Sequence, residues 1–412
     1  RKPPVEILFL THRVPDPPNR GDRIRAHHLL QFLAGQGNVS LGCLADEPVS
    51  ESSQATLESL CRQVAIEPLG ASRWLSGGLS GLRGRTITEG MFHSPKLRRT
   101  IRAWAAETSF DAVVVFCTSM LSYANLPELA RATTIVDLVD VDSQKWLDYA
   151  AAHRGPKRWI YQTEGRRLRK LECTLPSRAD HILLVSQQEA DLYLSFCPND
   201  RTLALPNGVD LEYFKPSGGP PAASGKVVFL GVLDYGANVN GLEWFCRKVW
   251  PGVRRHEPSL SFQIVGRRPN AAVKQLGELD GVELVGEVAD VRQYLQAAEV
   301  VIAPLQIARG IQNKVLEALA AGKPVVATPQ ALEGLPLVDD QTAITAATPQ
   351  QWQDALLALH DDVPRRERLG RQGRSYVEQH HHWQACLAPL STLLPGNAAA
   401  RDHSPTDSQV GS

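Results

Sequence analysis

Short apolar runs alternate with helical patterns along the whole chain. Apolar runs without strict polar alternation are typical of parallel strands that helices cover on both faces. We expect strands, in chain order, at 6–10, 39–44, 64–67, 112–116, 134–139, 181–185, 226–230, 261–265, 282–285, 300–303 and 324–327. Because a helical pattern follows most of these runs, the sequence predicts an α/β protein with two doubly wound, Rossmann-like halves.

The two halves are separated by the segment 206–225, which is rich in Pro, Gly and Ser. That composition predicts a linker. We expect an N-terminal domain over 1–205, a C-terminal domain over 226–375, a helix over 376–395 that packs back toward the N-terminal domain, and a disordered tail over 396–412. Ligands of open α/β sheets lie beyond the carboxyl ends of the strands, so two such domains facing across a cleft could hold two ligands together.

Composition narrows the class of protein. The chain has 412 residues, enough for two domains of ordinary size. Lys and Arg together number 44, as do Asp and Glu, so net charge gives no case for a nucleic-acid partner. Seven scattered cysteines form no CxxC pair and no zinc spacing, which fits reduced thiols in a cytoplasm. No run reaches the roughly 18 apolar residues of a membrane span. We therefore expect a cytoplasmic protein without a metal or a resident cofactor.

The most informative segment is 300–335, where a buried strand, a loop and a helix follow one another. We expect this helix to begin at Gly310 and to end near Ala321, with Lys314 and Glu317 on the face of Gly310. Free N–H groups and the helix dipole favour a pyrophosphate at such an N-terminus. Lys314 can neutralise it, and Glu317, one turn further, can accept hydrogen bonds from ribose hydroxyls. A buried helix with an i, i+3 ion pair is the alternative.

Five segments in this order resemble a known family: PPNRGDRIRAHHLL (17–30), VDLVDVDSQKW (136–146), PNGVD (206–210), GVLDYGANVNGLEWF (231–245) and ARGIQNKVLEALAAGKPVVAT (308–328). Together they are similar to the retaining glycosyltransferases of family 4, and within it to bacterial sugar transferases associated with exopolysaccharide and exosortase (PEP-CTERM) systems. The resemblance implies a GT-B fold, a UDP- or GDP-linked sugar as donor in the C-terminal half, and a lipid-linked or saccharide acceptor facing the N-terminal half.

The resemblance also assigns roles to residues. Glu317 stands where the family's glutamate grips the nucleotide ribose, whereas the first glutamate of its E-x7-E pattern is replaced by Arg309. A guanidinium at that position could favour an acidic or otherwise modified sugar. The residues expected to act in catalysis are Arg25, Asp140, Lys314 and Glu317. The residues expected to bind the donor are Gly21, Gly231, Asn238, Gly266, Arg267, Arg309, Gly310, Ile311, Asn313, Lys314 and Glu317. The residues expected on the acceptor side are Arg25, His28, Asp140 and Asp142.

Several of these residues have a plainer interpretation. Gly21 and Arg25 are also what an ordinary loop and helix after a first strand contain, and Arg267 could be a solvated loop arginine. Asp140 and Asp142 form a DxD triplet, which binds a divalent cation in the unrelated GT-A fold; here we expect metal-free roles, with an aspartate orienting or deprotonating an acceptor hydroxyl. Capping of the next helix is the alternative for Asp142.

Two basic stretches, 83–102 and 153–172, lie in the N-terminal half, and Trp159 and Tyr161 are interleaved in the second. A cationic surface with aromatic residues suits anionic lipid headgroups, which predicts a peripheral position at the inner face of the cytoplasmic membrane. A solvated helix face would have the same composition.

Two other functions fit the same scaffold. A GT-B sugar-nucleotide epimerase would release an altered sugar from the donor alone. A non-catalytic nucleotide-sugar-binding protein would bind the donor and leave it intact, and the missing first glutamate motivates this alternative. An NAD oxidoreductase is disfavoured, because no GxGxxG follows the first strand of either half.

Overall fold

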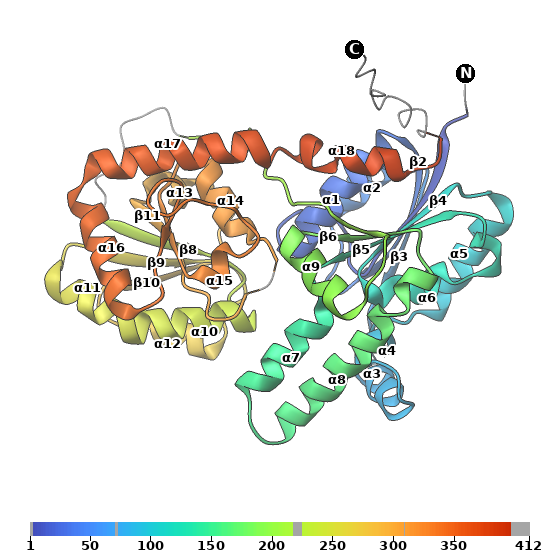
Figure 1. Cartoon of the computed structure of the whole chain (residues 1–412), viewed down its shortest axis with the longest axis horizontal. Coiled ribbons are helices and arrows are strands. Elements are labelled where there is room, and N and C mark those ends of the chain that lie inside the picture. The colour runs from blue at the N-terminus through green and yellow to red at the C-terminus, as the bar shows by residue number, and fades with distance from the viewer. Residues whose placement is uncertain (1–2, 71–72, 217–224, 309, 397–412) are drawn as a thin grey trace, which may run out of the picture. The chain divides into compact units, whose positions relative to one another are not determined.

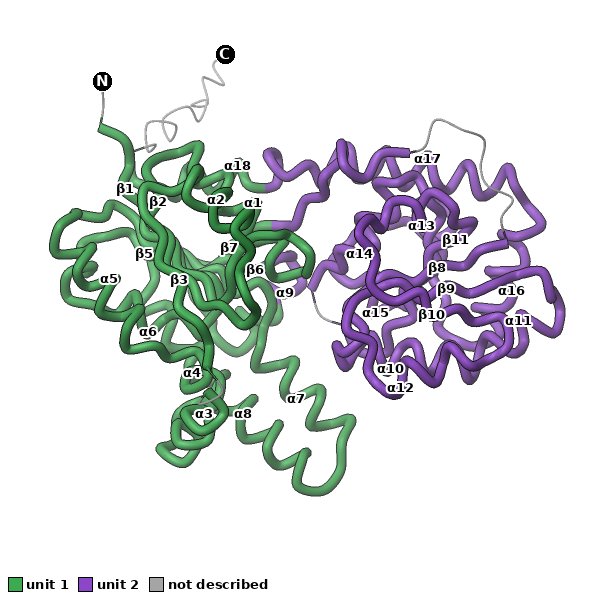
Figure 2. Tube along the Cα trace, turned by 180° about the vertical axis from the view of Figure 1, so that it is seen from behind, with its two compact units in different colours: residues 1–184, 192–205, 387–412 green, residues 185–191, 206–386 purple. Residues whose placement is uncertain are grey.

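The computed structural model describes residues 3–70, 73–216, 225–308 and 310–396. The chain divides into two compact units, each built on its own sheet (Figure 2). Unit 1 comprises Arg1–Leu184, Leu192–Leu205 and Leu387–Ser412, and unit 2 comprises Val185–Asp191 and Pro206–Cys386.

The sheet of unit 1 has seven parallel strands in the order β3-β2-β1-β4-β5-β6-β7. Their bounds are β1 Val5–Thr11, β2 Gly37–Ala45, β3 Gln63–Pro68, β4 Ala112–Phe116, β5 Thr133–Val139, β6 His181–Leu184 and β7 Thr202–Ala204. All five residues of β4 are buried, three of them valines, as a central strand covered on both faces requires.

Helices connect these strands and cover both faces of the sheet, with α1 and α2 on one face and α5 on the other (Figure 1). Their bounds are α1 Gly21–Ala34, α2 Glu51–Leu60, α3 Arg73–Leu82, α4 Ile87–Met91, α5 Pro95–Glu107, α6 Leu121–Ala124, α7 Asp142–Ala152, α8 Pro156–Glu172 and α9 Gln187–Phe196, with 3-10 turns at Thr118–Met120, Pro127–Leu129 and Leu175–Ser177. Two helical hairpins, α3–α4 and α7–α8, project from this unit beyond the sheet (Figure 1).

The sheet of unit 2 has six parallel strands in the order β10-β9-β8-β11-β12-β13. The strands are β8 Lys226–Leu230, β9 Ser261–Val265, β10 Val282–Gly286, β11 Val300–Ala303, β12 Val325–Ala327 and β13 Ile344–Thr345. The helices are α10 Gly236–Trp244, a π-helical segment at Phe245–Val249, α11 Trp250–His256, α12 Ala271–Leu276, α13 Arg292–Ala297, α14 Asn313–Ala320, α15 Pro329–Leu332, α16 Pro349–Asp361 and α17 Val363–His380. Two helices are divided between the units: α18 Trp383–Leu393 belongs to unit 1 from Leu387 onward, and α9 belongs to unit 2 up to Asp191.

The predicted fold class is confirmed: both units are Rossmann-like, and every expected strand is present within one or two residues of its predicted ends. The structure adds the edge strands β7 and β13, which are only three and two residues long. No helix in the described part of the chain is both long and apolar enough to cross a bilayer.

Two boundary predictions need correction. The single helix expected over 376–395 is two helices, because α17 ends at His380 and α18 begins at Trp383. The first residues of the expected linker 206–225 are packed within unit 2. Asn207 is buried, and its backbone oxygen lies 2.7 Å from Nδ1 of the buried His381. A Cβ on Gly208 would lie 2.6 Å from the backbone of Trp383. Residues 217–224 of that segment, and 397–412 of the expected tail, lie outside the described residues.

Candidate functional site

In unit 2 two glycines allow the carboxyl ends of β8 and β9 to lie very close together. A Cβ on Gly266, which follows β9, would lie only 1.7 Å from the backbone oxygen of Gly231, which follows β8. A Cβ on Gly231 would in turn lie 2.8 Å from Nδ2 of Asn238 and 3.2 Å from Nζ of Lys314. Because neither residue has a side chain, the ends of the two strands can lie close together beside the half-buried Lys314.

Lys314 lies in the first turn of α14, and its ammonium group is held by partners from the β8 side of the sheet. Its Nζ donates to Oδ1 of Asn238 at 2.6 Å and lies 4.4 Å from the ring centroid of Phe229. Asn238 is itself buried and donates from Nδ2 to the backbone oxygen of Val232 at 2.8 Å. Lys314 thus has a hydrogen-bond partner on α10 in addition to the attraction of Glu317, its i, i+3 neighbour.

The pKa values of Lys314 and Glu317 shift in opposite directions from their ordinary values. Burial lowers the pKa of Lys314 to about 7, and the attraction of Glu317 opposes that shift. Burial raises the pKa of Glu317 to about 7, and Lys314 opposes that shift in the same way. Both groups therefore have a pKa close to neutral pH, and both lie at the carboxyl end of a parallel sheet. Such a pair can bind a ligand that carries a negative diphosphate and hydroxyl donors.

The helix carrying these residues begins later than expected. Gly310 has a φ of +63°, in the left-handed region, so α14 cannot include it and begins at Asn313. Gly310 and Ile311 are buried residues of the turn that precedes the helix. At the far end the helix ends at Ala320, close to the predicted end near Ala321, and Gly322 just beyond it has a φ of +68°. Arg309 lies outside the described residues.

Three further residues of unit 2 border this region and were missed in the sequence. Asn207 donates from Nδ2 to Oδ1 of Asn313 at 3.0 Å and so connects the PNGVD segment to the start of α14. Burial, then Asp290 and to a smaller extent Glu317, raise the pKa of Tyr213. Phe229 lies beneath the Lys314 ammonium. The PNG triplet could have indicated a turn near the site, but a strand phenylalanine cannot be distinguished from ordinary core.

Arg267 is half-buried in the loop that follows Gly266. Its backbone oxygen accepts a hydrogen bond from the amide of Leu233 at 2.9 Å, which connects the loops after β8 and β9. The neighbouring Arg268, with a φ of +60°, forms an ion pair with Asp234 at 2.7 Å. The two loops are therefore joined by a backbone contact and by a charged one.

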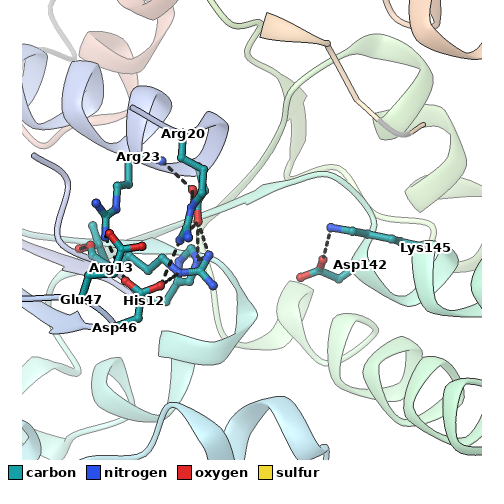
Figure 3. A network of polar contacts seen from close by, with 10 residues as sticks. His12, Arg13, Arg20, Arg23, Asp46, Glu47, Asp142 and Lys145 are labelled. Carbon is teal, nitrogen blue, oxygen red and sulfur yellow. Dashed lines mark hydrogen bonds and ion pairs between the residues drawn. The ribbon is translucent and has the colours of Figure 1, made fainter. Parts of the chain in front are cut away.

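In unit 1 the loop after β1 carries a dense ionic network (Figure 3). Arg13 and Arg23 reach Asp46 at 2.8 and 3.0 Å, and Arg20 reaches Asp22 at 2.7 Å. Although burial works against ionisation, hydrogen bonding and attraction from His12, Arg13 and Arg20 hold the pKa of Asp22 well below its usual range. The segment between β1 and α1 is thus fixed to the ends of β1 and β2 by charge.

His12 is buried at the end of this network. Its ring stacks on Phe116 with centroids 5.8 Å apart, and its Nε2 lies 3.3 Å from Oδ2 of Asp22. Burial lowers the pKa of His12. Its Nδ1 and the Oγ1 of Thr118 are buried without a hydrogen-bond partner among the described residues. Both atoms belong to residues that follow the carboxyl ends of strands.

The expectation that Arg25 touches substrate is wrong. Its side chain is fully buried, and its guanidinium binds Asp137 through Nε at 2.8 Å and Nη2 at 3.2 Å. Nη1 donates to the backbone oxygen of Leu205 at 2.9 Å. Arg25 thus connects α1, β5 and the end of β7 in the interior of unit 1, where it holds the strand ends in register.

Asp140 and Asp142 follow the carboxyl end of β5, as expected. Val139 has a φ of +69° at the turn, and Asp142 is the first residue of α7, so Val141 and not Asp142 occupies the N-cap position. Burial raises the pKa of Asp142 to about 6; Lys145, 3.6 Å away, opposes the shift and Asp140 adds to it. Figure 3 shows the contact of Asp142 with Lys145.

A cysteine that the sequence analysis passed over lies among these carboxylates. Cys117 follows β4 with a φ of +70°, and burial raises its pKa, with smaller contributions from Asp142, Asp137, Asp22 and Asp140. The carboxyl ends of β1, β4 and β5 therefore meet around Cys117. Within the described ranges no three His, Cys, Asp or Glu side chains are grouped so as to hold a metal.

The other residues expected in unit 1 lie on α1. Gly21 is exposed as the first residue of the helix. His28 is half-buried, with its ring edge-on to His27 at a centroid distance of 5.4 Å.

Comparison with known proteins finds a family match for part of the chain and two relatives. Residues 224–362 match the family described as glycosyl transferases group 1. D-inositol 3-phosphate glycosyltransferase of Paenarthrobacter aurescens is 30% identical over 241 residues, which are 53% of this chain and 55% of that protein. An uncharacterized 44.6 kDa protein in the cps region of Klebsiella pneumoniae is 23% identical over 346 residues, 80% of this chain and 84% of that protein.

Solved structures resemble nearly the whole chain. Anabaena HepE in complex with UDP has a TM-score of 0.67 at 16% identity, covering 94% of this chain and 98% of that one. Sucrose-phosphate synthase from Thermosynechococcus elongatus has a TM-score of 0.70 at 18% identity, with the same coverage of 94% and 98%. These likenesses show the fold, which is GT-B.

Proposed function

From the premise of a GT-B fold whose residues 224–362 match the group 1 glycosyl transferases, we propose that the protein is a glycosyltransferase. It moves a sugar from a UDP- or GDP-linked donor to a saccharide or lipid-linked acceptor. The matched relatives support this choice over an epimerase or a binding protein, since the D-inositol 3-phosphate enzyme of Paenarthrobacter is named for glycosyl transfer.

The observation that carries the proposal is the site at the strand ends of unit 2. Lys314, Glu317 and the backbone at Gly231 lie together there, with the lysine held by Asn238. In the proposed complex Glu317 accepts hydrogen bonds from the ribose hydroxyls. Lys314 and the amides of the Gly310–Ile311 turn stabilise the charge that develops on the departing diphosphate, which is the main catalytic contribution.

We assign the acceptor to unit 1. Asp140 and Asp142 follow β5, where an aspartate can orient an acceptor hydroxyl or remove its proton. Burial raises the pKa of Asp142 to about 6, close to the range in which a general base works at neutral pH. Arg25 takes no direct part, because its guanidinium is committed to Asp137. We further propose that transfer proceeds with retention and that Lys314 supplies the charge compensation without a metal.

The proposed biological role is synthesis of bacterial exopolysaccharide or another cell-surface glycan. The Klebsiella relative is described as a protein of the cps region, which supports this assignment. A lipid-linked acceptor would place the protein at the inner face of the cytoplasmic membrane. The two basic stretches 83–102 and 153–172 support that location through their attraction for anionic headgroups.

The donor sugar depends on Arg309, which stands where related enzymes carry a glutamate. We propose that its guanidinium favours an acidic or modified sugar, since a cation stabilises a carboxylate. Turnover of UDP-glucuronate is therefore expected to exceed that of UDP-glucose. A clear preference for UDP-glucose would refute this part of the proposal.

The proposed function is tested by screening a panel of nucleotide sugars for thermal stabilisation and then for turnover with lipid-linked and saccharide acceptors. Glu317→Ala is expected to abolish both the stabilisation and the turnover. The matched control is Glu278→Ala, which removes an exposed carboxylate elsewhere in unit 2. If Glu317→Ala keeps wild-type stabilisation and turnover, the assignment of the nucleotide site is wrong.

A further inference from the structure

Helix α3 of unit 1 exposes an unusual amount of apolar surface. Of its ten residues, Trp74, Leu75, Leu79 and Leu82 are 64%, 73%, 53% and 85% exposed. Single exposed apolar residues are ordinary, but four on one short helix are typical of a surface that meets an apolar partner.

The apolar side faces outward because the other side of α3 is packed. Gly77 is buried against α4, where a Cβ would lie 2.7 Å from Cγ of Met91. A Cβ on Gly90 of α4 would lie 2.5 Å from a backbone oxygen of α3. At about 100° per residue, Leu75 and Leu79 fall on the side opposite Gly77. The glycine contact therefore directs the leucines away from unit 1.

The α3–α4 hairpin is also firmly attached to α8. Buried Glu164 of α8 accepts hydrogen bonds from the amides of Ile87 and Thr88 at 2.9 and 3.0 Å, at the start of α4. Arg167 donates to the backbone oxygen of Gly81 at 2.8 Å. Figures 1 and 2 both show α4 beside α8. The exposed apolar face is thus presented by a fixed element.

A cationic cavity adjoins this face. It has a volume of about 490 Å³, and Arg85, Arg98 and Arg178 line it with Glu89 as the one carboxylate among its described lining residues. A second cavity of about 240 Å³ shares Arg85 and Glu89 and reaches Leu79 of α3. Positive charge and apolar surface are therefore continuous over the hairpin.

We propose that α3 and the arginine cavity form a docking site for the surface of an anionic phospholipid bilayer. The leucines and Trp74 enter the boundary between headgroups and acyl chains, while Arg85 and Arg178 hold headgroup phosphates. Charge complementarity selects this occupant, since three arginines against one glutamate suit phosphate better than a neutral apolar protein face. The inference rests on the proposed function, because a lipid-linked acceptor would be met at such a surface.

A second set of residues extends the same chemistry to the start of α8. Trp159 is 69% exposed there, and Ile160 is exposed beside it. Lys157 and Arg158 precede them and are exposed as well. By contrast Tyr161, which was expected on this surface, is half-buried and packs on Trp146 with ring centroids 5.4 Å apart.

The test is co-sedimentation of the full chain with vesicles of phosphatidylcholine alone or mixed with phosphatidylglycerol. The wild-type protein is expected to bind the mixed vesicles at least about ten-fold more strongly, with binding falling as salt is raised. Leu75→Ser with Leu79→Ser is expected to lower binding about ten-fold, and Arg85→Gln or Arg178→Gln about five-fold each, since one basic residue near an anionic surface contributes about five-fold.

Matched controls lie on unit 2. Leu279→Ser removes an exposed leucine and Arg255→Gln an exposed arginine there, and both should bind vesicles like wild type. Equal binding to both vesicle types, or wild-type binding by the α3 variants, would overturn the proposal. So would full competition by soluble glycerol phosphate, which would indicate a site for free phosphate compounds.

Nucleotide-induced thermal stabilisation, measured on the same variants, separates this inference from the proposed function. If the α3 variants keep the stabilisation but lose vesicle binding, the docking site is supported and the variants are folded. If wild type binds vesicles but no nucleotide sugar, the proposed function fails while the docking site stands.

Discussion

Nζ of Lys314 lies 2.6 Å from Oδ1 of Asn238, although the two residues are 76 positions apart on different helices. The contact follows from the sheet: α10 comes after β8 and α14 after β11, and these two strands are paired in parallel. The helices that follow neighbouring parallel strands both begin at the carboxyl edge of the sheet, so residues near the starts of the two helices lie close together there. The position of the lysine thus depends on a partner that local sequence does not reveal.

We therefore expect Asn238→Leu to weaken nucleotide binding about ten-fold. The leucine preserves size but removes the acceptor that orients the ammonium, and it leaves the backbone oxygen of Val232 without its donor. Isothermal titration with UDP and with GDP measures the effect. Asn240→Leu, on the exposed side of the same helix, is the control and should bind like wild type. Unchanged affinity in Asn238→Leu would show that Lys314 does not contact the nucleotide.

Gly241 is expected to be intolerant of even one added methyl group. A Cβ there would lie 2.6 Å from the backbone oxygen of Pro304, directly after β11, so Gly241→Ala must push α10 away from the sheet. We expect a loss of about 1–3 kcal/mol in the free energy of unfolding. Gly236→Ala in the same helix meets nothing within 4 Å and should change stability by less than about 0.5 kcal/mol. Urea unfolding compares the two, and equal effects would contradict the close approach.

Local pattern and chain order were enough to predict the strands, because short apolar runs rich in β-branched residues, such as the buried β4, strongly favour strands over helices or loops. Lys314 and Glu317 could also be predicted from local pattern, because residues three apart fall on one face of a helix. The start of that helix could not, because a glycine such as Gly310 suits a helix and a left-handed turn alike. Its φ of +63° decides between them.

Arg25 shows a different limit of sequence reasoning. A charged residue in the first turns of a helix after β1 is expected to face solvent or substrate, and nothing nearby in the sequence suggests otherwise. Its partner Asp137 lies 112 positions away in β5, a strand whose sequence indicates only a buried apolar segment. Only the pairing of β1 with β4, and of β4 with β5, brings them into contact.

Because both groups are fully buried, we expect Arg25→Met to lower the free energy of unfolding by about 3–5 kcal/mol. The double variant Arg25→Met with Asp137→Leu should recover part of that loss, because it removes the unpaired carboxylate. Arg62→Met, which breaks an exposed pair with Glu6, should cost less than about 1 kcal/mol. If Arg25→Met remains as stable as wild type but loses turnover, the arginine acts on substrate after all.

Chelation is expected to leave transfer unchanged, because in the proposed mechanism Lys314 and the Gly310–Ile311 turn supply the charge that would otherwise come from a cation. Turnover should be the same after dialysis against EDTA and after adding back Mg²⁺ or Mn²⁺. Dependence on either ion would overturn the metal-free assignment and direct attention to the Asp140 and Asp142 carboxylates. Asp142→Asn would then be expected to abolish the response to the ion.

We expect Glu172 to make the stability of unit 1 depend on pH. Its buried carboxyl accepts from the amide of Ser143 at 2.9 Å near the start of α7, and burial raises its pKa to about 8 although Ser143 and Arg169 oppose the shift. The unfolded chain releases this proton near the ordinary value of 4.5, whereas the folded chain keeps it until about pH 8. The folded state therefore binds the extra proton between these values, and its stability falls as the pH rises through that window.

Glu172→Gln keeps the shape and an amide oxygen for Ser143 but cannot titrate. We expect its free energy of unfolding to decline less steeply than that of wild type from about pH 5 to about pH 8, because Asp142 and Glu317, whose pKa values burial also raises, still titrate in that window. Urea unfolding at several pH values measures both slopes, and Glu107→Gln, at an exposed position on α5, should keep the wild-type slope. Parallel profiles for wild type and Glu172→Gln would mean that the buried carboxyl stays ionised throughout, held by Arg169 and the Ser143 amide.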